Sequence, residues 1–129
     1  MWSPYYDGFE IRSSANYDQE AGTEKVKAML DALPELTCTE PMRYKNAEGS
    51  PPLDLRLIKS HNGNYHAFPD TWHDTFNMIE IECAKRESNS DPIAQLALMI
   101  KIAKMLGWEL IKEEDDFSDE EDIVIWKPL

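Results

Sequence analysis

The sequence predicts a single α+β domain: an antiparallel sheet of five to seven strands with two helices packed on one face. Several short segments alternate apolar and polar residues with a period of two, as strands with one buried face do. Two longer segments carry apolar residues at helical spacing. The chain, residues 1–129, has the length of one domain with a substantial core.

The first half of the chain is predicted to contain a helix between strands. Residues 9–12 alternate as a first strand, and a helix is expected over about residues 20–33, where Pro34 ends it. The apolar face of this helix comprises Val26, Met29, Leu30 and Leu33. Alternation returns over residues 42–45 and 53–57, which predicts two further strands with one buried face each.

The second half begins with a turn at residues 61–64, where Asn-Gly favours a tight hairpin. Residues 78–84 then alternate as a longer strand. A second helix is expected to begin with Asp91 as N-cap and Pro92 as its first residue, and to end at Gly107. Its two apolar stripes are Ile93, Leu96, Ala97, Ile100 and Ala103, and beside them Leu98, Ile102 and Met105, while its plainly polar positions are Gln95, Lys101 and Lys104. So wide an apolar arc indicates burial against the sheet and a second element.

The densest charge in the chain lies in residues 113–122, the acidic run, which has eight carboxylates in ten positions. It holds two thirds of the net charge of −12. The apolar segments 108–111 and 123–126 flank it and predict two strands, so the acidic run is expected to be the loop of a hairpin. Such a run repels itself and attracts cationic partners.

Three interpretations of the acidic run remain open: a solvated loop, a recognition surface for a basic protein, and a divalent cation site. The run lacks the central glycine and ligand spacing of a calcium loop. Phe117 offers an apolar anchor among the charges. The residues expected to contact a partner are Glu113, Glu114, Asp115, Asp116, Phe117, Asp119, Glu120, Glu121, Asp122, Glu80 and Glu82.

Net negative charge argues against nucleic acid or an anionic membrane as a direct ligand. The sequence shows no secretory leader and no apolar stretch of membrane-spanning length, which favours a cytoplasmic protein. Cys38 and Cys83 are widely spaced and are expected to be reduced packing residues.

No catalytic residue, metal site or cofactor is predicted. The nearest approach to a metal-dependent hydrolase combines Asp70, Glu80 and Glu82 with a histidine. Metal-dependent nucleases place a lysine two positions after the second carboxylate, whereas Lys85 follows Glu82 by three. Cross-strand pairing of Glu80 and Glu82 with Arg56 or Arg43 is the simpler interpretation. The histidines, at positions 61, 66 and 73, lack zinc-site spacing.

The stretch from Gln95-Leu96-Ala97-Leu98 to Leu106-Gly107-Trp108-Glu109-Leu110, followed by acids, resembles the small acidic immunity proteins that bacteria carry beside contact-dependent or type VI toxins. The resemblance implies a non-enzymatic inhibitor that occludes the active or substrate-binding surface of a cognate basic toxin, such as a nuclease. The alternatives are a phage-encoded DNA mimic that blocks a defence nuclease, and a metal-dependent hydrolase. Monomer and dimer both remain open.

Overall fold

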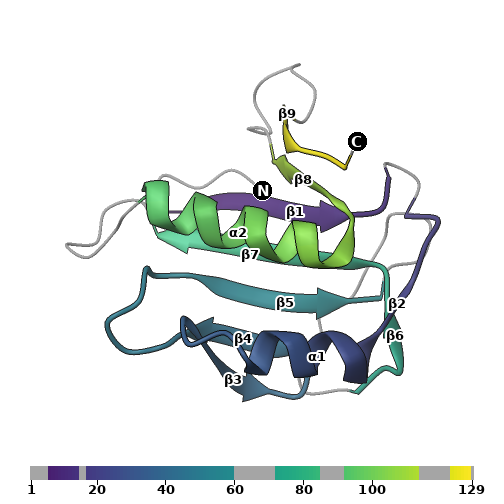
Figure 1. Cartoon of the computed structure of the whole chain (residues 1–129), viewed down its shortest axis with the longest axis horizontal. Coiled ribbons are helices and arrows are strands. Elements are labelled where there is room, and N and C mark those ends of the chain that lie inside the picture. The colour runs from purple at the N-terminus through teal and green to yellow at the C-terminus, as the bar shows by residue number, and fades with distance from the viewer. Residues whose placement is uncertain (1–5, 15–16, 60–71, 85–91, 114–122, 129) are drawn as a thin grey trace.

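The computed structural model describes residues 6–14, 17–59, 72–84, 92–113 and 123–128. Its main sheet consists of β1 (Tyr6–Arg12), β3 (Leu36–Glu40), β4 (Arg43–Asn46), β5 (Asp54–Ile58), β7 (Met78–Ala84), β8 (Glu109–Lys112) and β9 (Ile123–Trp126). These seven strands lie in the order β3-β4-β5-β7-β1-β8-β9, and each pair of neighbours is antiparallel. Two helices cover one face of the sheet (Figure 1). The predicted α+β fold is confirmed.

Strand β1 lies in the interior of the sheet, between β7 and β8, although it precedes both of them in the chain. It pairs with β7 on one side and with β8 on the other, so that Ile11 is opposite both Ile79 and Leu110. All three of these side chains are fully buried. The odd-numbered residues of β1, β5 and β7 therefore form the floor of the core, and their even-numbered neighbours point to the opposite face.

Helix α1 (Thr23–Asp31) is shorter than the sequence predicts, because Ala21 and Gly22 form strand β2 (Ala21–Gly22) instead of a first helical turn. This short strand pairs with β6 (Thr75–Phe76) at one end of the main sheet. The predicted apolar face is otherwise correct, since Val26, Leu30 and Leu33 are buried in the core.

Helix α2 (Pro92–Leu106) begins and ends as predicted. It buries the second predicted stripe at Leu98 and Ile102 but only Ala103 of the first stripe. Its buried residues are Gln95, Leu98, Met99, Ile102 and Ala103. Ile93 is 83% exposed and Ala97 is exposed too, so the first predicted stripe is wrong at both positions. Gln95 is buried because its side-chain amide donates a hydrogen bond of 2.5 Å to the carbonyl of Pro52, which satisfies a polar group that burial would otherwise penalise.

The two cysteines differ in environment and are not joined by a disulfide. Cys83 is buried in the core, as predicted. Cys38 is exposed on β3, the strand at one edge of the sheet, so its predicted role as a packing residue is wrong. The predicted turn at residues 61–64 and the N-cap Asp91 lie outside the described residues.

Candidate partner-binding surface

The strands that flank the acidic run form the predicted antiparallel pair. In β8 and β9, Lys112 lies opposite Ile123, Ile111 opposite Val124, and the register then shifts by one residue. Glu113 is described, while residues 114–122, including Phe117, lie outside the described part of the chain. The acidic run thus leaves β8 at Glu113 and rejoins the sheet at Ile123.

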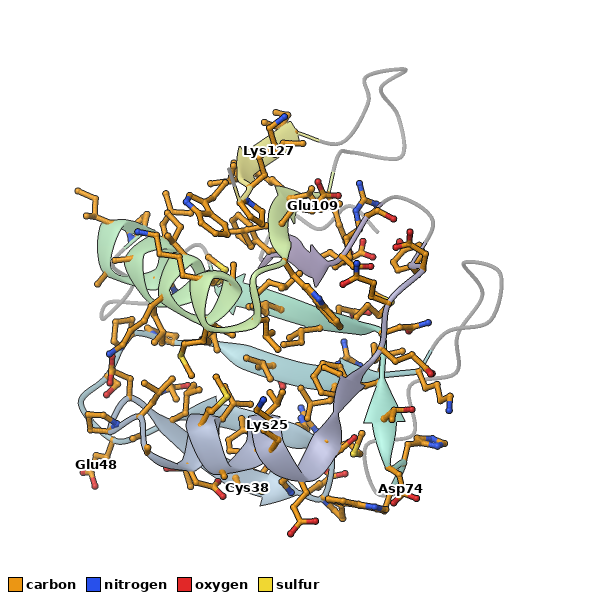
Figure 2. All side chains as sticks on the ribbon, turned by 45° about the vertical axis from the view of Figure 1, so that its right-hand side comes forward. Lys25, Cys38, Glu48, Asp74, Glu109 and Lys127 are labelled. Carbon is orange, nitrogen blue, oxygen red and sulfur yellow. The ribbon has the colours of Figure 1, made fainter. Side chains whose placement is uncertain are left out.

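Strand β8 is fixed firmly, because Leu110 and Ile111 are fully buried. Trp126 of β9 packs against the core from the edge of the sheet, and the ammonium group of Lys104 lies 5.9 Å from the centre of its ring. Figure 2 marks Glu109 and Lys127 at the end of this hairpin that lies away from the acidic run. Both ends of the run are therefore attached to structure that the core holds in place.

The first half of β9 is much less covered than β8. Ile123 and Val124 are each 48% exposed, and both belong to the few large apolar residues exposed in the described part of the chain. They directly follow the acidic run in the sequence. An apolar strand edge thus directly follows a dense block of negative charge along the chain.

Glu113 is the point where the acidic run joins the sheet. Its backbone N–H donates a hydrogen bond of 3.0 Å to the carbonyl of Gly8. Its carboxylate lies over Gly8 so closely that a Cβ atom there would come within 2.7 Å of Oε2. Burial raises the pKa of Glu113 to about 7, and the nearby carboxylates of Glu80 and Glu10 act in the same direction.

A charged surface, called here the open face, lies on the side of the sheet opposite the helices. It comprises the even-numbered side chains of β1, β5 and β7, together with Arg43 of β4 and Glu109 of β8, which are opposite Arg56 and Arg12. Glu80 and Glu82, predicted to contact a partner, both lie here and both bind Arg56, at 2.6 and 3.3 Å. The Glu80 side chain is only 12% exposed, whereas that of Glu82 is 42% exposed. The predicted pairing with Arg56 is confirmed, while Arg43 binds Asp54 and Glu40 instead.

A second group on the open face was not predicted. Arg12 donates to Glu109 at 2.8 Å, and it lies 5.8 Å from the centre of the Tyr17 ring. Burial and a hydrogen bond with Glu10 raise the pKa of Tyr17 to about 12. Because this group joins β1, β8 and the loop after β1, no local sequence pattern reveals it. Its charges, like those around Arg56, are partly compensated, because one arginine faces two carboxylates in each group.

The other residues considered for metal chemistry lie only partly within the described ranges. Among the described residues, no group of three or more His, Cys, Asp or Glu side chains is placed to hold a metal ion. Asp70 and Lys85 lie outside the described residues, as do the histidines at 61 and 66.

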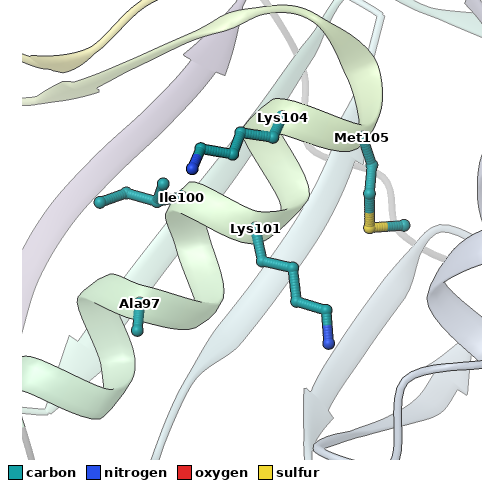
Figure 3. A pocket seen from close by; sticks show the side chains of 5 residues that line it. All are labelled: Ala97, Ile100, Lys101, Lys104 and Met105. Carbon is teal, nitrogen blue, oxygen red and sulfur yellow. The ribbon is translucent and has the colours of Figure 1, made fainter.

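A shallow hollow of about 450 Å³ lies along the outer surface of α2 and has the opposite charge character. Its lining residues are Ala97, Ile100, Lys101, Lys104 and Met105 (Figure 3). Two lysines beside apolar side chains do not suit a basic partner. The hairpin edge and this helix surface are therefore distinct in chemistry.

Comparison with known protein families, curated proteins and solved structures finds no match to this chain. No helix within the described ranges is long and apolar enough to cross a membrane. The candidate surface therefore rests on its own geometry: an acidic run held at both ends by β8 and β9, an apolar edge beside it, and a sheet face whose carboxylates are mostly bound to arginines.

Proposed function

We propose that this chain is a non-enzymatic binding protein that neutralises a basic protein partner, in the manner of a bacterial immunity protein. The partner would be a cognate toxin domain, and the chain would act in the cytoplasm by covering the toxin's active or substrate-binding surface. The observation that carries the proposal is the attachment of the acidic run to the sheet through β8 and β9. A charged segment held at both ends presents its carboxylates in a restricted region of space.

The distribution of charge over the rest of the molecule supports the same site. On the open face, the carboxylates of Glu80, Asp54 and Glu109 each contact an arginine, so their fields are largely cancelled at a distance. The acidic run has eight carboxyl groups in ten residues without a single lysine or arginine. It is therefore the main source of the long-range field that would steer a cationic partner into contact.

The chemistry of the partner follows from this field. A nuclease binds a polyanion through a cationic surface, and a dense block of carboxylates competes for that surface by replacing phosphate. The same charge opposes direct binding of nucleic acid or of an anionic membrane. We therefore assign the inhibitory role to protein–protein contact, with no metal or cofactor.

A DNA mimic, the alternative binding function, requires carboxylates in rows over an extended surface at phosphate spacing. The acidic residues of the open face alternate with Arg12, Arg43 and Arg56, and this alternation interrupts any such row. The charge pattern therefore favours a localised contact over mimicry.

In the first test, the chain is immobilised and used to capture binding partners from an extract of the source cell. We expect a basic protein that elutes with salt and whose activity the chain blocks. Replacing Asp115, Asp116, Glu120 and Glu121 with Asn or Gln should then reduce the association rate and its dependence on salt.

A matched pair of double variants separates local from global charge. Glu120→Gln with Glu121→Gln removes two charges from the acidic run, and Glu24→Gln with Glu48→Gln removes two from exposed positions elsewhere. Only the first pair should slow association strongly. Equal effects of the two pairs, or unchanged affinity after the fourfold replacement, would mean that the run only aids solubility. A captured ligand that proves to be nucleic acid would contradict the proposal outright.

A further inference from the structure

Strand β9 forms one edge of the main sheet, with β8 as its only neighbour among the described strands (Figure 1). An edge strand presents backbone N–H and C=O groups that can pair with a strand from another molecule. The other edge, β3, differs because its exposed residues Thr37, Cys38 and Thr39 are small. Apolar residues are thus exposed at the β9 edge and not at the β3 edge.

The register identifies which backbone groups of β9 point outward. Glu113 donates its N–H to Gly8, so its backbone polar groups face β1. Successive residues of a strand direct these groups to opposite sides, so those of Lys112 face β9 and those of Ile123, its opposite residue, face β8. It follows that the N–H and C=O of Val124 point away from the sheet.

The side chains at this position suit a further strand as well. Val124 and Ile123 are half-exposed on a strand whose later residues, Ile125 and Trp126, pack against the core. A neighbouring strand would cover these two aliphatic side chains through cross-strand contacts. One continuous edge therefore offers both an outward backbone pair and apolar surface.

Charge determines what kind of strand fits. The acidic run ends at residue 122, immediately before Ile123, so an added strand that runs antiparallel to β9 would bring its C-terminal end next to the carboxylates. Antiparallel pairing is also slightly the more stable arrangement per residue. A second copy of the chain would instead bring together two molecules with a net charge of −12 each.

We propose that β9 is a strand-addition site for an extended segment of the basic partner, which pairs antiparallel to β9 and continues C-terminally into lysines and arginines. The proposal rests on the proposed function, because the same partner supplies the segment. The acidic run then determines the association rate, and the backbone pairing at Val124 determines the dissociation rate.

The probe for this site is a fluorescent nine-residue peptide, Thr-Val-Thr-Val-Thr-Lys-Arg-Lys-Arg. Its control has the same composition with the two blocks exchanged, Lys-Arg-Lys-Arg-Thr-Val-Thr-Val-Thr. In antiparallel pairing this order puts the basic end of the peptide away from the acidic run. The first peptide should bind more tightly, and it should slow hydrogen exchange of the Val124 amide. In the chain alone this amide should exchange faster than that of Ile123.

Two variants isolate the backbone contact. Val124→Pro removes the outward N–H without removing a bond to β8, and proline is tolerated on edge strands. Val124→Thr keeps the N–H and the β-branched shape. The proline variant should bind the peptide about fivefold more weakly than the threonine variant, the effect of one hydrogen bond. Tryptophan fluorescence confirms that both variants are folded.

A second measurement leaves the chain unchanged. Peptides N-methylated at both valines or at all three threonines place the methyl groups on opposite edges of the peptide strand. One pattern should abolish binding and the other should not. Equal binding of the two, with unchanged affinity for the Val124→Pro variant, would overturn strand addition while leaving the electrostatic role of the acidic run intact.

The converse outcome separates the two proposals. If the fourfold neutralised chain binds the peptide as well as the parent does, strand addition stands and the electrostatic proposal fails. A doubling of the mass of the chain in solution, reversed by Val124→Pro, would show that β9 pairs with a second copy and would overturn the assignment to a basic partner.

Discussion

Replacing Glu113 with Gln should stabilise the fold at neutral and alkaline pH. Glu113 lies against Gly8 beside two other carboxylates, and burial raises its pKa from 4.5 to about 7. The folded protein therefore retains a proton on this side chain that the unfolded chain has already lost. Gln has the shape of the protonated side chain and does not titrate, so it removes this penalty.

The size and sign of the effect follow from linkage. Below pH 4.5 the carboxyl group is protonated in both states; between 4.5 and about 7 only the unfolded state ionises, so the contribution of Glu113 to stability falls as the pH rises, and it levels off above 7. The full difference corresponds to at most about 3–4 kcal/mol. Because Glu113 is only partly buried, solvent screening reduces the expected gain for Glu113→Gln to about 1–2 kcal/mol above pH 7.

Urea denaturation from pH 4 to 8.5 measures this directly. The difference in unfolding free energy between variant and parent should be small at low pH and grow through neutrality. Gly8→Ala is the structural control, because the added methyl group should displace the Glu113 carboxylate toward water and lower its pKa. NMR titration of Glu113 in the variant measures this pKa. A difference that stays constant across the pH range would show that Glu113 is already ionised in the fold, and would refute this account of its environment.

Three further predictions concern stability and reactivity. Arg56→Met removes the ion pair between Arg56 and the little-exposed Glu80 and should cost about 2 kcal/mol in urea denaturation, whereas Lys59→Met, at an exposed ion pair, should cost less than about 1 kcal/mol. Equal costs would contradict this. Gln95→Leu should cost about 1–2 kcal/mol because the carbonyl of Pro52 loses its donor, and no loss in thermal or urea unfolding would mean that water replaces it. A thiol reagent should modify Cys38 in the native protein and Cys83 only after denaturant is added, and two equally fast reactions would refute the burial of Cys83.

The sequence predicts the strands and helices of this fold best where one face is buried and the other is wet. Strand β7 shows this clearly, since Ile79 and Ile81 are fully buried while Glu80 and Glu82 lie on the open face. Strand β3 was missed because three of its five residues are exposed, which leaves no alternation to recognise. An edge strand is defined by its neighbour, and that neighbour is not visible in local sequence.

The buried face of helix α2 was predicted only in part, for a related reason. Its composition is apolar on nearly every side, so periodicity does not determine which stripe faces the sheet. The buried position of Gln95 depends on the carbonyl of Pro52, which is far away in the chain. The candidate surface was predicted in its strands and charge, but the outward edge at Val124 follows only from the register of three strands.

The position of β1 between two strands from later in the chain has a consequence for biosynthesis. This strand is synthesised before the rest of the sheet, yet both of its partners, β7 and β8, come from the second half of the chain. Until they are synthesised, both edges of β1 remain without these partner strands. The pairing of β1 with β8 joins residues that are about a hundred positions apart in the chain. Such long-range closure predicts slow folding and a reliance on chaperones during translation.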